Sequence, residues 1–473
     1  MATKRLVLGE WLPDQPGLTG AITEAFNVVP VLNGYGPIPS VERLSNDATE
    51  NLIATFTGKF GDTVQLFAGG ATKLFQFEPN TLNLVNVSKT GDYTGVLNWN
   101  FVQFGKVIIA ANGNDKLQAW TIGTSTDWDD VSADAPPARF VTVVRDFVAA
   151  ANDSANPNRV YWSDINNETN WTSGTTSQSD FQDIPDGGSI QGITGGEFGL
   201  VLLERAIHRM SYIGSPLFFQ FDAISRTLGC YEPNSIVQQG GRTFFLSDDG
   251  FYVCDGQNVT PISAEKVSRW FFDDVEEGLL DKMSSAIDPE RNLVVWCYPN
   301  SNAGQTLLAF NWQTNRWSYA LTSADYVANA STIGTTLEQL NIYGGLEDVP
   351  ASLDSRLWRG GKPLFAGTRN TKVILFSGTP MAAEVETGDI EEGMQSIMKL
   401  AYPQVDGGSA SVAVASRFRL DDSVSYSDDI PATDENRVSL RSVGRYHRLR
   451  IKPTGNWQTM MAVDIEAQQV GSR

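Results

Sequence analysis

The sequence predicts an all-β protein: a β-propeller of about six or seven blades, an extended N-terminal arm and a small C-terminal antiparallel β-sandwich. A recurring segment is the first observation behind this prediction. Each copy has a short apolar strand, a turn built on Gly, Asn or Asp, and a second strand ending in an aromatic residue. Apolar residues within a copy alternate with a period of two, which favours strands over helices. The copies start roughly 40 to 53 residues apart, the spacing of a four-stranded propeller blade.

The clear copies lie between residues 60 and 315. They are VQLFAGGATKLFQF (64–77), KVIIAANGNDKLQAW (106–120), DFVAAANDSANPNRVYW (146–162), GLVLLERAIHRMSYI (199–213), RTFFLSDDGFYVCDG (242–256) and NLVVWCYPNSNAGQTLLAFNW (292–312). A seventh candidate, PLFAGTRNTKVILFSG (363–378), shares the FAG turn of the first copy. The stretch 318–358 between the sixth and seventh copies is therefore predicted to be an insertion or an irregular blade.

The turns support hairpins, because Gly69-Gly70, Asn112-Gly113-Asn114 and Asp248-Asp249-Gly250 tolerate positive φ at little cost. A second hairpin with an aromatic on each arm often follows, as from Trp120 to Trp128 and from Trp162 to Trp171. Each unit thus has four strands. Such sheets bury their faces by stacking around an axis, and radial closure removes most exposed edges.

Composition changes along the chain and predicts three parts: 1–50, 51–378 and 379–473. The first contains five prolines among small residues, which favours an extended arm lying on another surface. Its apolar side chains need cover, and we expect another subunit to supply it; they are Trp11, Phe26 and Val28 to Val31. The last part has alternating segments such as SASVAVASRFRL and YHRLRIKP, typical of a sandwich of about five or six strands.

Residues suited to catalysis are few. The two histidines, His208 and His447, stand alone in strand-like segments, so we interpret both as structural histidines with satisfied hydrogen bonds. No nucleophile elbow, phosphate loop or HExxH motif is present. Propeller glycosidases use carboxylates on inner strands, and the candidates by position are Asp146, Glu204, Asp248, Asp249 and Asp288. Because most of these also fit hairpin turns, we predict that none is catalytic.

Metal and cofactor sites are not predicted either. Asp153 with Asn156, and Asp186-Gly187-Gly188, could offer oxygen ligands to Ca²⁺, but neither has the spacing of a calcium loop. The three cysteines lie in or beside apolar strands without a CxxC pair, and we expect buried free thiols; they are Cys230, Cys254 and Cys297. The N-terminal apolar run is cut short by Gly9 and Glu10, so we expect neither a secretory signal nor a membrane span.

The formal net charge is −20, with a sequence pI near 4.5. Tight nucleic-acid binding needs a dense basic surface, so a DNA-binding regulator is disfavoured. The acidity fits a channel wall that repels phosphate as well as it fits a generally solvated acidic surface. The exception is the stretch 437–453, where Arg448, Arg450 and Lys452 would share one strand face. This basic stripe would suit either solvent or the acidic surface of a neighbouring subunit.

Several segments together resemble the tail nozzle or hub proteins of short-tailed bacteriophages, also described as packaged-DNA stabilisation proteins. They include NFVQFGKVIIAANGNDKLQAW, SDFQDIPDGGSIQGITGGEFGLVLLERAIHRMSYIG, SDDGFYVCDG and EKVSRWFFDD, and a terminal module from AEVETG to GRYHRLRIKPTGNW and VDIEAQQVG. The resemblance spans nearly the whole chain through many modest motifs. It implies a structural virion protein without an active site.

The resemblance also implies partners. Six copies would surround the tail axis, join the portal–adaptor complex to the distal needle or fibre proteins, and enclose the DNA exit channel without reading its sequence. The protein would be made in the host cytoplasm and reside in the virion tail. Two other classes stay open: a propeller carbohydrate-active enzyme, expected if Asp146, Glu204 and Asp248 meet at one mouth of an axial pocket, and a receptor-binding tail adhesin.

Overall fold

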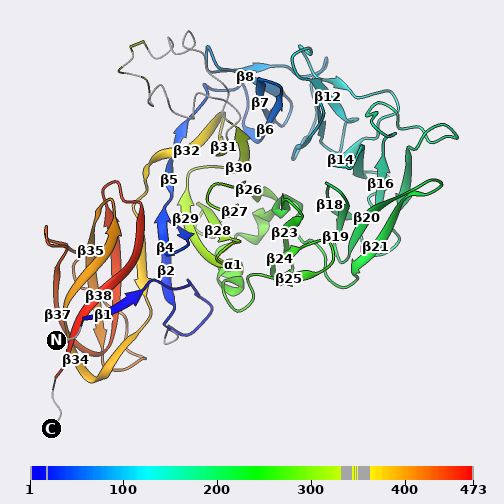
Figure 1. Cartoon of the computed structure of the whole chain (residues 1–473). Helices are drawn as coiled ribbons and strands as arrows, with labels where there is room; N and C mark the ends of the chain where they lie inside the picture. The colour runs from blue at the N-terminus through cyan, green and yellow to red at the C-terminus, as the bar shows by residue number, and fades with distance from the viewer. Residues whose placement is uncertain are drawn as a thin grey trace.

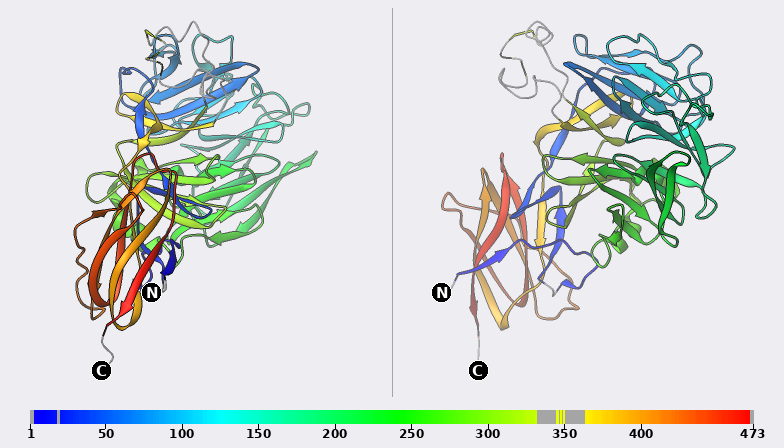
Figure 2. Two further views of the ribbon diagram at one scale, coloured as in Figure 1. Left: turned by 60° about the vertical axis from the view of Figure 1, so that its left-hand side comes forward. Right: turned by 45° about the vertical axis from the view of Figure 1, so that its right-hand side comes forward.

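The computed structural model describes residues 3–17, 20–331, 344, 345, 347, 349 and 363–470. Most of these residues form antiparallel strands, accompanied by a short α-helix, α1 (Ser268–Asp274) (Figure 1). A ring of sheets makes up one part of the molecule, and a group of long C-terminal strands lies beside it (Figure 2). The first and last described strands, Thr3–Val7 and Thr459–Gln469, pair with each other in the C-terminal part.

Within the described residues, six separate four-stranded antiparallel sheets form a β-propeller. The first sheet contains β6 (Leu52–Phe60), β7 (Thr63–Gly70), β8 (Leu74–Glu78) and β9 (Asn83–Asn86). The second contains β10 (Asn100–Phe104), β11 (Val107–Ala111), β12 (Gln118–Thr121) and β13 (Asp129–Asp130). The third contains β14 (Ala138–Val144), β15 (Phe147–Asp153), β16 (Arg159–Trp162) and β17 (Asp180–Asp183). The fourth contains β18 (Ile190–Thr194), β19 (Gly199–Leu203), β20 (Ile207–Gly214) and β21 (Phe218–Ser225). The fifth contains β22 (Val237–Gln239), β23 (Arg242–Ser247), β24 (Gly250–Cys254) and β25 (Val259–Pro261). The sixth contains β30 (Tyr326–Ser331), β31 (Pro363–Arg369), β32 (Lys372–Pro380) and β5 (Pro39–Arg43). The predicted all-β propeller is confirmed.

A further meander of four antiparallel strands stands between the fifth and sixth of these sheets, and its first strand contacts both β22 and β30. Its strands are β26 (Ser284–Asp288), β27 (Leu293–Pro299), β28 (Gln305–Asn311) and β29 (Arg316–Thr322). Every repeated segment of the sequence coincides with the second and third strands of a unit, including 292–312 on β27 and β28 and 363–378 on β31 and β32. The apolar alternation therefore marked the middle of each sheet.

The meander is not a separate sheet, because its hydrogen bonding continues into the C-terminal strands. They are β33 (Glu384–Thr387), β34 (Ile390–Asp406), β35 (Ser409–Arg417), β36 (Ile430–Pro431), β37 (Val438–Thr454) and β38 (Thr459–Gln469). The four meander strands, these six strands and β1 to β4 together make a sheet of 14 described strands. The connection runs through β2 (Ile22–Phe26), which pairs in parallel with β29 and antiparallel with β33.

The N-terminal segment corrects the predicted 1–50 arm. β1 (Thr3–Val7) pairs with β38, the hairpin of β3 (Val28–Val31) and β4 (Gly34–Pro37) bonds to β38 through Tyr35, and β5 is the outer strand of the β30–β32 sheet. The propeller therefore begins before residue 51. Proline-rich composition suggested a segment without partners. Pro30, Pro37 and Pro39 nevertheless fall within or at the ends of short strands whose remaining backbone groups still pair, while Pro13 and Pro16 lie between β1 and β2.

The same chain covers several apolar side chains of this segment for which we expected cover from another subunit. Trp11 is 1% exposed and its ring lies 4.8 Å from Trp270 of α1 and 5.2 Å from Tyr319 of β29. Val28 and Val29 are also buried. One core cluster thus includes residues of the meander, α1, the N-terminal segment and the C-terminal strands.

The stretch 318–358 contributes the end of β29 and all of β30, so part of it belongs to regular sheets. Residues 332–343, 346, 348 and 350–358 of the predicted insertion lie outside the described residues.

Candidate functional site

The first strands of all the ring units surround one central cavity of about 800 Å³. Its lining is rich in side-chain amides: Asn98, Asn100, Asn112, Asn114, Asn152, Asn234, Asn329 and Gln238. Arg139 and Asp281 are the charged side chains among the described residues that line it. A cavity of this size is within the range of small-molecule pockets.

Many of these amides are already used to join neighbouring units. The inner edge of each first strand has backbone N–H groups with no strand beside them, and buried N–H groups need acceptors. Asn100 Oδ1 accepts the N–H of Val141 at 2.8 Å, and Asn329 Oδ1 accepts that of Ile287 at 2.7 Å. The lining is therefore chiefly structural.

Two glutamines make the same bidentate contact at separate places in the ring. Gln103 Nε2 donates to Lys59 O at 2.6 Å while its Oε1 accepts the Lys59 N–H at 3.0 Å. Gln238 Nε2 donates to Gly195 O at 2.6 Å while its Oε1 accepts the Gly195 N–H at 3.3 Å. In both units the glutamine stands two residues before a turn glycine, Gly105 or Gly240. Sequence reasoning missed this pair, although aligning the repeats would have shown the shared Gln-x-Gly.

Two asparagine side chains meet across the cavity. Asn98 precedes β10 and Asn234 precedes β22, three units away around the ring, yet Asn98 Nδ2 donates to Asn234 Oδ1. Asn234 Nδ2 in turn donates to Asp281 O at 2.8 Å. A side-chain hydrogen bond between units that are not neighbours therefore crosses the cavity.

A buried carboxyl group lies beside this contact. Glu232 is 8% exposed and its Oε1 accepts the N–H of Asn234 at 3.0 Å. Burial raises the pKa of Glu232 to about 7, and the nearby Arg139 charge opposes that rise while Asp281 adds to it. Ser285 Oγ, which also lines the cavity, donates to Asn234 O at 2.9 Å, so the polar groups around this carboxyl are engaged with one another.

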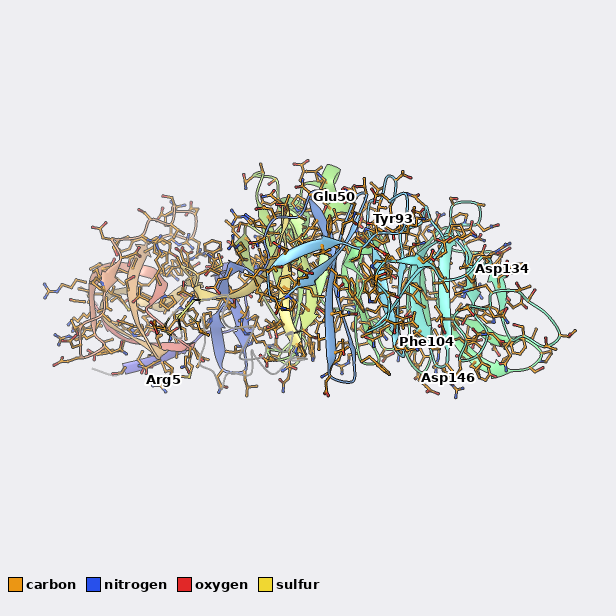
Figure 3. The ribbon with its side chains drawn as sticks, turned by 90° about the horizontal axis from the view of Figure 1, so that it is seen from above. Arg5, Glu50, Tyr93, Phe104, Asp134 and Asp146 are labelled. Atoms are coloured by element: carbon orange, nitrogen blue, oxygen red, sulfur yellow. The ribbon has the colours of Figure 1, made fainter. Side chains whose placement is uncertain are left out.

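The five candidate carboxylates do not meet. Asp146 follows β14 and Asp288 ends β26, at turns between first and second strands, whereas Glu204, Asp248 and Asp249 occupy turns between second and third strands. These turns lie at opposite ends of the second strand and therefore on opposite faces of the ring. Figure 3 shows Asp146 and Phe104 on one face of the ring and Glu50 on the opposite face. Glu50 accepts the N–H groups of Thr72 and Lys73, which lie in the turn between the second and third strands of the first sheet.

Local contacts account for most of these carboxylates. Asp249 Oδ2 accepts the hydroxyl of Tyr252 at 2.8 Å, and Asp288 Oδ1 accepts the N–H of Glu290 at 3.1 Å. Burial raises the pKa of Asp288. None of the five lines the central cavity. The condition set for a propeller glycosidase, three carboxylates at one mouth, is not met by Asp146, Glu204 and Asp248.

The suggested calcium ligands are used by the protein itself. Asp153 Oδ1 accepts the N–H groups of Ala155 and Asn156, each at 2.7 Å, and its Oδ2 accepts the hydroxyl of Tyr161. Asp186 forms an exposed ion pair with Arg226 at 2.7 Å. Among the residues the structure describes, no group of three or more His, Cys, Asp or Glu side chains is arranged to hold a metal ion.

The histidines differ from each other. His447 is buried between Ser396 Oγ, 2.8 Å from its Nε2, and Ser416 Oγ, 2.7 Å from its Nδ1, as expected for a satisfied structural histidine. Ser396 is also fully buried, so this Ser–His contact cannot reach a substrate. His208 is buried too, but neither ring nitrogen has a hydrogen-bond partner in the described part of the chain, which corrects the prediction for that residue. Burial lowers the pKa of both rings.

The basic stripe pairs with acidic side chains of its own chain. Arg448 Nε contacts Asp389 Oδ1 at 2.9 Å, and Asp429 pairs with Arg450 at 3.2 Å and Lys452 at 2.9 Å. The acidic partners come from the turn before β34 and the loop before β36, which the local sequence does not place beside β37. All three cysteines are buried free thiols, as predicted.

Comparisons with protein-family models and with curated proteins find no match. Among solved structures, the chain is similar to the Neurospora crassa Pan2 WD40 domain, with 9% identity and a TM-score of 0.40 over 72% of this chain and 96% of that one. The computationally designed Ika8 protein gives 10% identity and a TM-score of 0.37 over 71% and 99% of the two chains. A chain of the mitotic checkpoint complex gives 8% and 0.40 over 73% and 93%. At these values the likenesses carry no argument about function. No described helix is long and apolar enough to cross a membrane.

Proposed function

We propose that this chain is a structural component of a short bacteriophage tail, a nozzle or hub that links the portal–adaptor complex to the distal tail. The observation that carries the proposal is the sequence resemblance to tail nozzle proteins over nearly the whole chain. Within it, β26–β29 serve as the seventh blade and β33–β38 as the C-terminal sandwich. Copies of the chain form a ring, expected to be hexameric, around the tail axis.

The internal bracing of the molecule supports a load-carrying role. The N-terminal segment bonds to β29, β32, β33 and β38, and Asp14 accepts the N–H groups of Arg269 and Trp270 of α1, each at 2.9 Å. The propeller and the C-terminal strands are thereby joined by main-chain hydrogen bonds and by one shared core. Such a joint resists relative motion of the two parts.

DNA would pass between copies rather than through a propeller. The Asn98–Asn234 hydrogen bond crosses the central cavity of each chain, so a duplex has no path there. A net charge of −20 suits a wall that repels phosphate. At roughly 0.15 M salt we expect duplex DNA to bind the purified protein no better than on the order of 10⁻⁴ M. A nanomolar affinity in a gel-shift titration would exclude a passive conduit.

The alternatives are a carbohydrate-active propeller enzyme and a receptor-binding adhesin. Polysaccharide turnover by the purified protein that disappears in Glu204→Gln or Asp248→Asn, while the protein stays folded, would favour the enzyme.

The decisive experiment is electron microscopy of particles in which this chain carries a C-terminal tag detected by gold-labelled antibody. We expect label at the tail, between connector and distal tip, with six copies in rotational symmetry. Label on peripheral fibres or spikes in threefold symmetry would favour the adhesin, and particles without label would refute the virion role.

A further inference from the structure

The joint between the propeller and the C-terminal strands depends on β2. Phe26 pairs in parallel with Tyr319 of β29, and on its other side β2 pairs antiparallel with β33. The described hydrogen bonding of the 14-stranded sheet passes from propeller to C-terminal strands only through these contacts. Any repulsion between β2 and β33 therefore acts on the joint itself.

Two glutamates face each other across that pairing. Glu24 of β2 stands directly opposite Glu386 of β33. Side chains at opposed positions of an antiparallel pair lie on the same face, and like charges there destabilise the sheet. Glu24 also accepts the hydroxyl of Tyr319, so it is held in the seam rather than free to turn towards solvent.

The nearby cations pair with other carboxylates, and the Arg450 charge only partly offsets that of Glu386. Arg450 lies 4.0 Å from Glu384 and 3.2 Å from Asp429, and Lys452 lies 3.2 Å and 2.9 Å from the same two carboxylates. In the described part of the chain no cation lies within ion-pair distance of Glu24 or Glu386. The groups facing the pair are Tyr319 on β29, Asp274 on α1, Glu384 on β33, Tyr426 and Asp429 before β37, and Arg448, Arg450 and Lys452 on β37.

We propose that the facing carboxyls of Glu24 and Glu386 make this joint pH-sensitive, firmly closed while one carboxyl stays protonated and loosened when both ionise. Closely placed carboxylates behave in this way because two like charges in one site cannot both form without a cost in free energy. The proton leaves to solvent.

The direction of the pH effect follows from the two glutamates. Burial raises the pKa of Glu24 from 4.5 to about 7, with Glu386 and Glu384 adding to the rise and the Tyr319 hydrogen bond opposing it, and burial likewise raises the pKa of Glu386. Between about pH 4.5 and 7 the closed joint therefore binds a proton that separated strands would release. Its stability is greatest at the acidic end and falls as the pH rises through that window.

The test is hydrogen exchange measured by mass spectrometry on the full chain at pH 5.5 and 8.5, corrected for the intrinsic pH dependence of exchange. We expect amides of β2 and β33 to lose protection by about tenfold at pH 8.5, while blade amides of β11 and β15 stay unchanged. Glu24→Gln removes one of the two charges and should make protection of the joint equal at both pH values. The matched control, Glu197→Gln, changes a glutamate whose side chain is 82% exposed and should keep the wild-type response.

Glu386→Gln provides the same test from the partner strand if Glu24→Gln does not fold. Equal protection of the wild-type joint at both pH values would overturn the proposal. A loss of protection that spreads equally to the blades, or one that persists in both glutamine variants, would overturn it as well. None of these outcomes depends on whether the protein belongs to a phage tail.

Discussion

The blades and the N-terminal segment are built in opposite ways. Most blades pair strands that follow each other along the chain, as when Phe104 pairs with Val107. The N-terminal strands pair with partners hundreds of residues away: Arg5 stands opposite Asp464, and Val41 opposite Phe376. Local repeats therefore form most of the sheets, whereas a short non-repeated segment joins them into one molecule.

Closure of the ring illustrates the point. The β30–β32 sheet would have three strands and an open outer edge without β5, and exposed edges invite unwanted pairing. The same segment fills the outer edge of β29 with β2. The start of the chain therefore covers both long outer strands that the last part of the propeller leaves open.

Removing residues 1–43 should have the largest effect on folding. We expect this truncation to abolish soluble folded protein, because it deletes β1 to β5, including the strands that cover β29 and β32, and removes Trp11 from the core. Expression followed by size-exclusion chromatography and far-UV circular dichroism would measure this. Removing residues 1–7 alone, which deletes β1, is the control and should leave a folded protein. A monodisperse, cooperatively folding 44–473 chain would mean that the segment is an appendage.

Trp11→Ala should destabilise the protein by about 3–5 kcal/mol, the usual cost of truncating a buried tryptophan. Trp11 contacts both α1 and β29, so we also expect the thermal transition to broaden or divide as the two parts lose their coupling. Trp120→Ala is the comparison; Trp120 is equally buried but lies in the cluster between the first two blades, away from α1 and β29. Identical calorimetric profiles for the two variants would refute a coupling role for Trp11.

Gln103→Ala should have a smaller effect, about 1–2 kcal/mol, because it removes hydrogen bonds to the Lys59 backbone at a partly exposed position. Gln238→Ala tests the equivalent contact to Gly195 and should cost a similar amount. Chemical denaturation would give both values. A change below the error of the measurement in both variants would show that inter-blade packing alone fixes the ring.

The smallest effect should come from an ion pair within one blade. Arg159 Nε lies 2.6 Å from Asp183, but the carboxylate is 48% exposed, so Asp183→Asn should cost below about 1 kcal/mol. Hydrogen bonding to Arg159 lowers the pKa of Asp183, so any contribution is present at neutral pH and is lost as the pH falls through the folded value. Denaturation midpoints at pH 7 and pH 3 would measure it. A cost comparable with that of Trp11→Ala would contradict this ranking.

The candidate residues were predicted unevenly. Turn carboxylates such as Asp249 were recognised because a turn is a local property of sequence. The Asn98–Asn234 contact and the Glu24–Glu386 pair were not, because each joins segments that approach only when the ring closes or the seam forms. The basic side chains Arg448 and Lys452 shared a strand face as predicted, yet their acidic partners depended on where a distant turn and loop came to lie.

The sequence by itself determined the all-β class, the period of the units and the position of each apolar strand, since alternation and turn residues act between neighbours along the chain. It also determined that the cysteines are buried, because they stand inside apolar strands. The tertiary structure alone decided which strand covers which edge, how the N-terminal prolines are accommodated, and which charges pair. Those outcomes depend on long-range pairing, whose free energy is the sum of many contacts between residues far apart in sequence and leaves no local pattern to read.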